Sequence, residues 1–273
     1  MRWNSVRNFA AVALFITAVV PSMAQDPDNT NDYRSLVKQG EDALARNDLR
    51  LAARVFQHAV DLNPSSVRAH EGLGVALLRE LSSGAVNPSA DTDVADRAEE
   101  HLKQAAQLSP SAARPLLELA DLEALLAEHS ADERTRAERY KNARDALTQA
   151  ISLDPSKPEV YLRLATMERD EFGPVLDQVK ARYPNSAGPI PDVALRKDLQ
   201  QRYLQLVDDA IANAQRASEM NANSQRPLLL LSKLFRQRAL LRDTQEQYAM
   251  DMHTAADWER QFMAAGGHVS AQK

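Results

Sequence analysis

The sequence predicts an all-α fold, a solenoid of stacked helical hairpins with long insertions between helices and a capping helix at its C-terminal end. Three observations support this prediction. An apolar helical pattern ends three times in nearly the same phrase, as AVDLNPSS, AAQLSPSA and AISLDPSK. Apolar residues on both sides of the phrase recur at spacings of three, four and seven, the period of one helix face. Glycine and β-branched residues are sparse in these segments, which argues against strands.

The end of each phrase fixes the register of a repeated unit. Pro64, Pro110 and Pro155 mark three copies, and Ala222 marks a degenerate fourth. Alanine stands 12 and 5 residues before every mark, at Ala52, Ala59, Ala98, Ala105, Ala143, Ala150, Ala210 and Ala217. Small side chains on one helix face let a second helix approach closely. We therefore predict that the segment before each mark is the second helix of a hairpin.

A second helical pattern begins just after each mark. Leucine lies nine residues on, at Leu73, Leu119, Leu164 and Leu231. The next residue is small in every copy: Gly74, Ala120, Ala165 and Ser232. Three prolines fall in the first turn of this pattern, where a missing N–H costs nothing: Pro115, Pro158 and Pro227. Each mark is therefore the turn between the second helix of one unit and the first helix of the next.

This arrangement resembles the tetratricopeptide repeat (TPR), in which a large residue, Leu and a small residue are followed by Ala, an aromatic residue, Ala and Pro. The first copy starts at Tyr33 and matches at Leu36, Gly40, Ala52, Phe56, Ala59 and Pro64. Gln39 departs from the pattern, which has Leu there. The resemblance covers about residues 33–235. With the capping helix, it implies a solenoid over residues 33–265 with four to five helix pairs.

The units are longer than a TPR. The marks are 46, 45 and 67 residues apart, against about 34 for a TPR. In the second unit the surplus, residues 82–93, has loop composition. In the third, Ser130 and Glu133 have the spacing of a capping box, which predicts a longer second helix. In the fourth, we predict an insertion that leaves the solenoid at residues 170–193, because Gly173-Pro174 and SAGPIP break the helix on either side of a short helical segment.

The two ends of the chain are predicted to lie outside the solenoid. Arg2, Arg7, the apolar run Phe9–Val20 and the small residues before Gln25 have the layout of a signal peptide over residues 1–24, cut after Ala24. The expected location is therefore periplasmic or secreted. The apolar run is short for a membrane span, so we expect membrane attachment only if the segment is not cleaved. Residues 25–32 are predicted to be a linker and residues 266–273 a disordered tail.

Composition and motifs argue against several classes of function. The net charge of −5 becomes −7 when Arg2 and Arg7 are removed, a poor match for nucleic acid. The chain has no cysteine, and therefore no disulfide or thiolate site. It also lacks HExxH, GxSxG, Walker A and GxGxxG motifs. The stretch DPDNTND lacks the glycine and the twelfth-position glutamate of a calcium loop. We therefore expect no catalytic residue, no metal and no cofactor.

Arginine recurs at one position of the repeat. Arg68, Arg114 and Arg226 follow their marks by four residues, and Arg34 holds the matching place in the first unit. The TPR resemblance implies that this position faces the concave side. The sequence-based candidates for a partner-binding groove are therefore Arg34, Glu41, Arg68, Arg114, Arg169 and Arg226.

Two interpretations of these arginines are open. They meet carboxylates of a partner, or they pair with acids of the chain itself, such as Glu41, Glu71 and Asp121, as weak surface ion pairs. The asparagines of carboxylate-clamp TPRs are absent, since Val37 and Val75 stand in two of those places and Glu41 in the third. The resemblance therefore does not imply specificity for a C-terminal carboxylate.

These features favour a non-catalytic scaffold in the cell envelope or exported space that binds a protein or peptide partner in a concave groove. There are two alternatives. The first is an enzyme or glycan-binding accessory with a site formed by residues 170–193, which a closed pocket with charged residues there would favour. The second is a structural adaptor in envelope assembly, which a hydrophobic patch on the convex face would favour.

Overall fold

A computed structural model describes residues 27–84, 88 and 92–266. This part of the chain contains ten α-helices and no strand. They are α1 (Pro27–Ala45), α2 (Leu49–Leu62), α3 (Val67–Ser82), α4 (Thr92–Leu108), α5 (Ala113–Glu128), α6 (Glu133–Leu153), α7 (Pro158–Arg182), α8 (Val193–Met220), α9 (Gln225–Leu240) and α10 (Gln245–Ala264). The predicted all-α class is confirmed. The predicted signal peptide and the tail after residue 266 lie outside the described residues.

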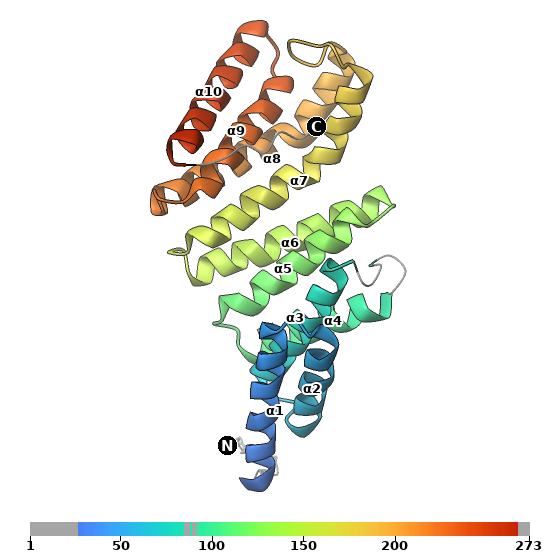
Figure 1. Ribbon diagram of the computed structural model, residues 1–273. Helices are drawn as coiled ribbons and strands as arrows, with labels where there is room; N and C mark the ends of the chain where they lie inside the picture. The colour runs from blue at the N-terminus through green and yellow to red at the C-terminus, as the bar shows by residue number, and fades with distance from the viewer. Residues whose placement is uncertain (1–26, 85–87, 89–91, 267–273) are drawn as a thin grey trace, which may run out of the picture.

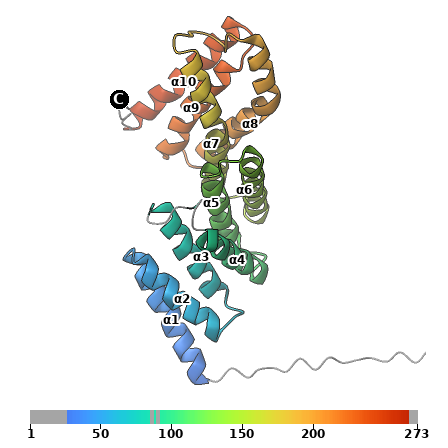
Figure 2. The same cartoon turned by 90° about the vertical axis from the view of Figure 1, so that its right-hand side faces the viewer.

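The helices form five antiparallel hairpins stacked in chain order, from α1–α2 at one end to α9–α10 at the other (Figure 1). Each odd-numbered helix contacts the next odd-numbered helix, whereas the even-numbered helices of the described chain do not contact one another. The odd helices therefore lie closer together, and the array bends toward them, as the turned view shows (Figure 2). This makes the odd helices the concave layer and the even helices the convex layer of a solenoid.

The predicted alanine contacts are present in every repeat. All eight alanines that stand 12 and 5 residues before the marks are at most 1% exposed. Between α2 of the first unit and α3 of the second, another small residue allows an even closer contact. The ring of Phe56, itself 1% exposed, lies so close to Gly72 that a Cβ added there would be 2.4 Å from the ring. Glycine is required at that place because two helices meet across an aromatic ring.

The repeated phrase ends each second helix by side-chain chemistry. After α2, the Asn63 side-chain oxygen accepts the backbone N–H of Ser65 at 3.2 Å, and Asp154 does the same for Ser156 at 3.1 Å. Such local bonds replace helical ones and form a turn. The start of α6 differs from the prediction: Asp132, not Ser130, is the N-cap and accepts the N–H of Thr135. A carboxylate at the N-cap also suits the positive end of the helix dipole.

The predicted break at Gly173-Pro174 is wrong. Helix α7 runs through both residues to Arg182. A proline inside a helix costs about 3 kcal/mol. The turns that surround it bury Phe172, Leu176 and Val179, and each buried apolar side chain contributes roughly 1.5–3 kcal/mol. Burial therefore outweighs the proline.

Residues 170–193 consequently belong to the solenoid rather than to an excursion from it. The second predicted break is correct, because α7 ends before Tyr183 and α8 begins after its N-cap Asp192. The connection between them is fixed at Ile190, which is 1% exposed and donates its backbone N–H to Leu240 O at 3.0 Å. The extra residues of the fourth unit therefore lengthen both helices of its hairpin, α7 with 25 residues and α8 with 28.

Helix α1 begins at Pro27, so the part of the predicted linker that the structure describes is helical. At the other end, α10 occupies the place predicted for the capping helix, and Trp258 packs against the core of the last hairpins. No helix in the described ranges is long and apolar enough to cross a membrane.

Candidate partner-binding surface

The concave layer carries one Arg–carboxylate pair at each of the four junctions between successive odd helices. The arginine always comes from the later helix. The pairs are Arg68–Glu41 (2.5 Å), Arg114–Glu71 (2.7 Å), Arg163–Asp121 (2.6 Å) and Arg226–Glu159 (3.2 Å). We call these eight residues the arginine ladder. In this structure Arg68 and Arg114 therefore pair with acids of the chain itself, as the second interpretation of the recurring arginines expects.

Pairing leaves three of the four ladder arginines largely exposed. Arg68, Arg114 and Arg226 are 68–71% exposed although each forms an ion pair. The contacting atoms are Nη2 of Arg68, Nε of Arg114 and Nη1 of Arg226. A guanidinium group has five N–H donors in a planar fork. Each of these three arginines is therefore held by an internal pair while most of its side chain stays exposed on the odd-helix layer, where an external carboxylate can accept the remaining N–H donors.

In three of the four ladder pairs the acid is less exposed than the arginine, whereas Asp121 is 44% exposed and its partner Arg163 is 29% exposed. Burial raises the pKa of Glu71, which the nearby Arg114 guanidinium opposes. Burial raises the pKa of Asp121 to about 6, with Arg163 opposing and Glu118 adding to the increase. With a pKa of about 6, Asp121 is mainly ionised at neutral pH. In the other three pairs the arginine is the more exposed partner, so its guanidinium group is the more accessible one.

Three groove candidates have different surroundings. Glu41 lies in the ladder as the partner of Arg68. Arg34 is exposed and forms no ion pair within residues 27–84, 88 and 92–266. Arg169 lies outside the ladder, because its Nε and Nη2 atoms donate to the adjacent Asp170. The structure therefore brings Glu41, Arg68, Arg114 and Arg226 into one layer and separates Arg169 from them.

Two glutamates that the sequence motifs did not single out are buried. Glu123 and Glu168 are 1% and 4% exposed, and both stand 13 residues after their mark, in α5 and α7. The same position holds Leu77 in α3 and Phe235 in α9, both buried. An acid at an otherwise apolar register position was therefore the sequence signal for them.

The two glutamates differ in their partners. Arg139 of α6 bridges Glu123 at 3.0 Å and Glu99 of α4 at 2.7 Å, so a cation of the chain neutralises Glu123. Glu168 is bonded instead to an amide, because Asn213 of α8 donates to its Oε2 atom at 3.2 Å. Burial raises the pKa of Glu168 to about 8. This carboxyl group is therefore mostly protonated at neutral pH.

Other polar groups have structural roles. His70 is 6% exposed and shares hydrogen bonds with Pro64 O and with His101, each at 3.0 Å, so its imidazole is a satisfied group of the core. No group of three or more His, Cys, Asp or Glu residues in the described part of the chain is arranged to hold a metal ion.

Comparison with known proteins supports the repeat architecture. Residues 37–81 match the family model for the tetratricopeptide repeat. No curated protein sequence matches the chain. Among solved structures, MamA 41-end from Desulfovibrio magneticus RS-1 aligns with a TM-score of 0.55 and 14% identity, over 89% of this chain and 97% of that one. A crystal structure of MamA protein aligns at 0.52 and 13%, over 88% and 99%. At these identities the likeness shows the fold, an all-α solenoid of the TPR type.

Proposed function

We propose that this chain, a tetratricopeptide-repeat solenoid, is a non-catalytic scaffold that binds an acidic segment of a protein or peptide partner along its concave face. The observation that supports the proposal best is the arginine ladder. Three guanidinium groups at equivalent positions of α3, α5 and α9 stay about 70% exposed. Carboxylates of an extended segment can accept the remaining N–H donors without breaking the internal pairs.

The expected effect of charge reversal tests this proposal. The double variant Arg68→Glu, Arg114→Glu places two negative charges beside Glu41 and Glu71, so an acidic partner is repelled. Partner recovery by affinity capture and mass spectrometry should fall at least about tenfold, the usual scale for unfavourable charge at an interface. The thermal midpoint should change little, because exposed ion pairs contribute only about 0–1 kcal/mol.

Arg50→Glu and Arg54→Glu together provide a matched control. Both arginines lie on α2, in the convex layer, and line a different recess. The control carries the same charge change and should capture the partner as the wild type does. Equal loss of capture in both double variants would mean that net charge, not the concave face, determines binding. Unchanged capture in the ladder variant would rule out the concave site.

We also propose that the protein is exported. The support is the sequence layout of residues 1–24, which is typical of a cleaved signal peptide. Intact-mass measurement of protein isolated from its native compartment should give a chain that begins at Gln25. A mass that retains Met1–Ala24 would indicate a membrane-tethered protein instead.

Two alternative functions have less support. The recess beside residues 170–193 is lined by Glu171, Pro174 and Tyr203 among others, but its volume is only about 90 Å³, whereas ligand sites commonly have about 300–1,000 Å³. The large apolar side chains that are exposed in the described part of the chain are spread over α6, α8 and α10 and form no single convex patch. They are Leu153, Val193, Met250 and Met263.

A further inference from the structure

Two recesses on the convex layer occupy equivalent places in different repeats. The first lies between α2 and α4 over α3, with a volume of about 680 Å³, and the second lies between α6 and α8 over α7, with about 450 Å³. They arise because consecutive even helices do not contact each other in the described chain. We call the second one the α6–α8 recess. It is lined by Arg144, Asp145, Thr148, Leu164, Glu168, Asp209, Ala212 and Asn213.

The two recesses carry opposite charge at matching register positions. Ten residues before the mark, Arg54 in the first corresponds to Asp145 in the second. Thirteen residues before the next mark, Arg97 corresponds to Asp209. On the floor, where the first recess has Leu77, the second has Glu168. The two recesses are built from equivalent helices, so these differences in charge change which ligand groups, anionic or cationic, each recess can accept.

Glu168 has a free oxygen in this recess. Oε2 accepts the amide of Asn213, whereas Oε1 accepts no hydrogen bond in the described part of the chain and is not fully buried, so it is accessible from the recess that Glu168 lines. The nearest cation of the recess, Arg144, is engaged by Glu171. A buried carboxylate is costly unless a cation or several donors satisfy it. The register-equivalent Glu123 shows the usual solution, because Arg139 of the same chain neutralises it.

We propose that the α6–α8 recess binds the cationic end of a lysine or arginine side chain from a protein partner, with Glu168 as the buried counter-charge and Asp209 and Asp145 at the rim. The helix α8 residue that matches Arg139 in register is Leu206, so the chain has no cation there and the partner supplies it. The carboxyl groups of one recess then recognise a basic segment, independently of the concave face.

Cation binding at this site should depend on pH, because it is coupled to the loss of a proton from Glu168. Burial raises the pKa of Glu168 to about 8, so binding of a cation at neutral pH requires that the carboxyl group release its proton. Affinity should therefore fall by about tenfold for each pH unit below pH 7 and level off above pH 8. The other charged groups around this carboxyl are Arg144 of α6, Asp209 of α8 and Glu171 of α7.

The test uses Nα-acetyl-L-arginine amide as the probe and the matching citrulline amide, which has the same shape without the charge, as the control ligand. Proton–nitrogen NMR of the full chain follows the side-chain amide of Asn213 and the backbone amide of Thr148. The arginine probe should shift both signals with saturation, and the citrulline probe should not. Glu168→Gln should weaken binding more than about tenfold, as loss of a buried charge partner does.

Asp177→Asn is the control variant, because Asp177 is an exposed acid of α7 outside the recess. It should bind the arginine probe as the wild type does, and so should the ladder variant Arg68→Glu, Arg114→Glu. The proposal is overturned if both probes shift Asn213 equally, if Glu168→Gln binds unchanged, or if affinity is independent of pH. Because the ladder variant keeps this recess, failure here and failure of the concave site are separate results.

Discussion

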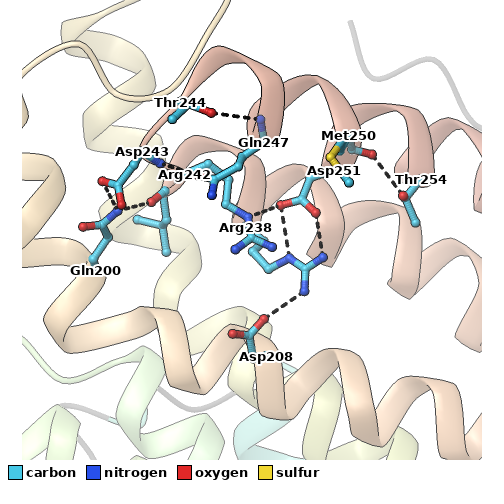
Figure 3. Close-up of polar contacts among 11 residues, drawn as sticks. Gln200, Asp208, Arg238, Arg242, Asp243, Thr244, Gln247, Met250, Asp251 and Thr254 are labelled. Atoms are coloured by element: carbon cyan, nitrogen blue, oxygen red, sulfur yellow. Dashed lines mark hydrogen bonds and ion pairs between the residues drawn. The ribbon is translucent and has the colours of Figure 1, made fainter.

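Replacement of Asp251 by asparagine should lower the free energy of unfolding by about 3 kcal/mol, the cost of removing one partner of a buried ion pair. The Asp251 side chain of α10 is 6% exposed and contacts two arginines, Arg238 of α9 and Arg242 of the connection between α9 and α10 (Figure 3). It accepts bonds from Arg238 Nε and Nη2 at 3.1 and 2.6 Å and from Arg242 Nε at 2.6 Å. Asparagine cannot neutralise either guanidinium.

The loss should be largest at the C-terminal end of the solenoid. Arg238 also donates to Asp208 of α8 at 2.9 Å, so one cluster joins α8, α9 and α10 (Figure 3). A terminal helix has a neighbour on one side only, and local opening there costs less than global unfolding. Hydrogen exchange in α10 should therefore accelerate more than exchange in α3 or α5.

Urea unfolding with hydrogen exchange by mass spectrometry measures both effects. The matched control is Asp257→Asn, on the same helix, where the carboxylate is 38% exposed and pairs with Arg260. An exposed pair of this kind contributes at most about 1 kcal/mol, so the control should unfold close to the wild type. If the two variants lose equal stability, the buried cluster is not what holds α10.

The repeat architecture was predictable because it depends on local pattern. The alanines before each mark and the leucines after it determine which helix faces are buried, and the structure buries all of them except Leu119, which is partly buried. The error at Gly173-Pro174 has a physical reason. A helix breaker is a local signal, whereas the burial of Phe172 and Leu176 that overrides it depends on contacts with distant segments such as α8.

The candidate sites were only partly predictable. The recurring arginines were evident, but which acids they pair with depends on the offset between stacked helices, and that offset is a property of the packed array. Glu41 and Glu71 are accordingly bound by arginines 27 and 43 residues later in the chain. The buried glutamates were visible in principle as acids in an apolar register position. Their different partners, Arg139 and Asn213, appear only in three dimensions.

Glu168→Gln should stabilise the protein above pH 8 by about 5 kcal/mol and have little effect below pH 4.5. The folded pKa of Glu168 is about 8, against an ordinary value of 4.5. The folded state thus holds this proton more tightly than the unfolded state. The stabilisation that results is complete below pH 4.5 and is lost as the pH rises through 8. Each unit of the shift corresponds to about 1.4 kcal/mol.

Chemical denaturation of the wild type and the variant between pH 4 and pH 9 measures the effect. Asp121 and Glu171, whose pKa values are also raised by burial, titrate in both proteins, so the difference between the two curves isolates Glu168. Asp177→Asn should give a curve parallel to that of the wild type. Parallel curves for Glu168→Gln as well would show that this carboxyl group ionises in the folded state without cost.

The same measurement connects stability to the proposed cation site. If a guanidinium group occupies the α6–α8 recess, it compensates the charge that Glu168 carries above pH 8. The arginine probe should then raise the unfolding midpoint of the wild type at pH 9, have less effect at pH 6, and leave Glu168→Gln unchanged at both values. The citrulline probe should give no such difference. If Glu168 has no role beyond the fold, the protein should still lose stability at high pH, but the arginine probe should not restore it.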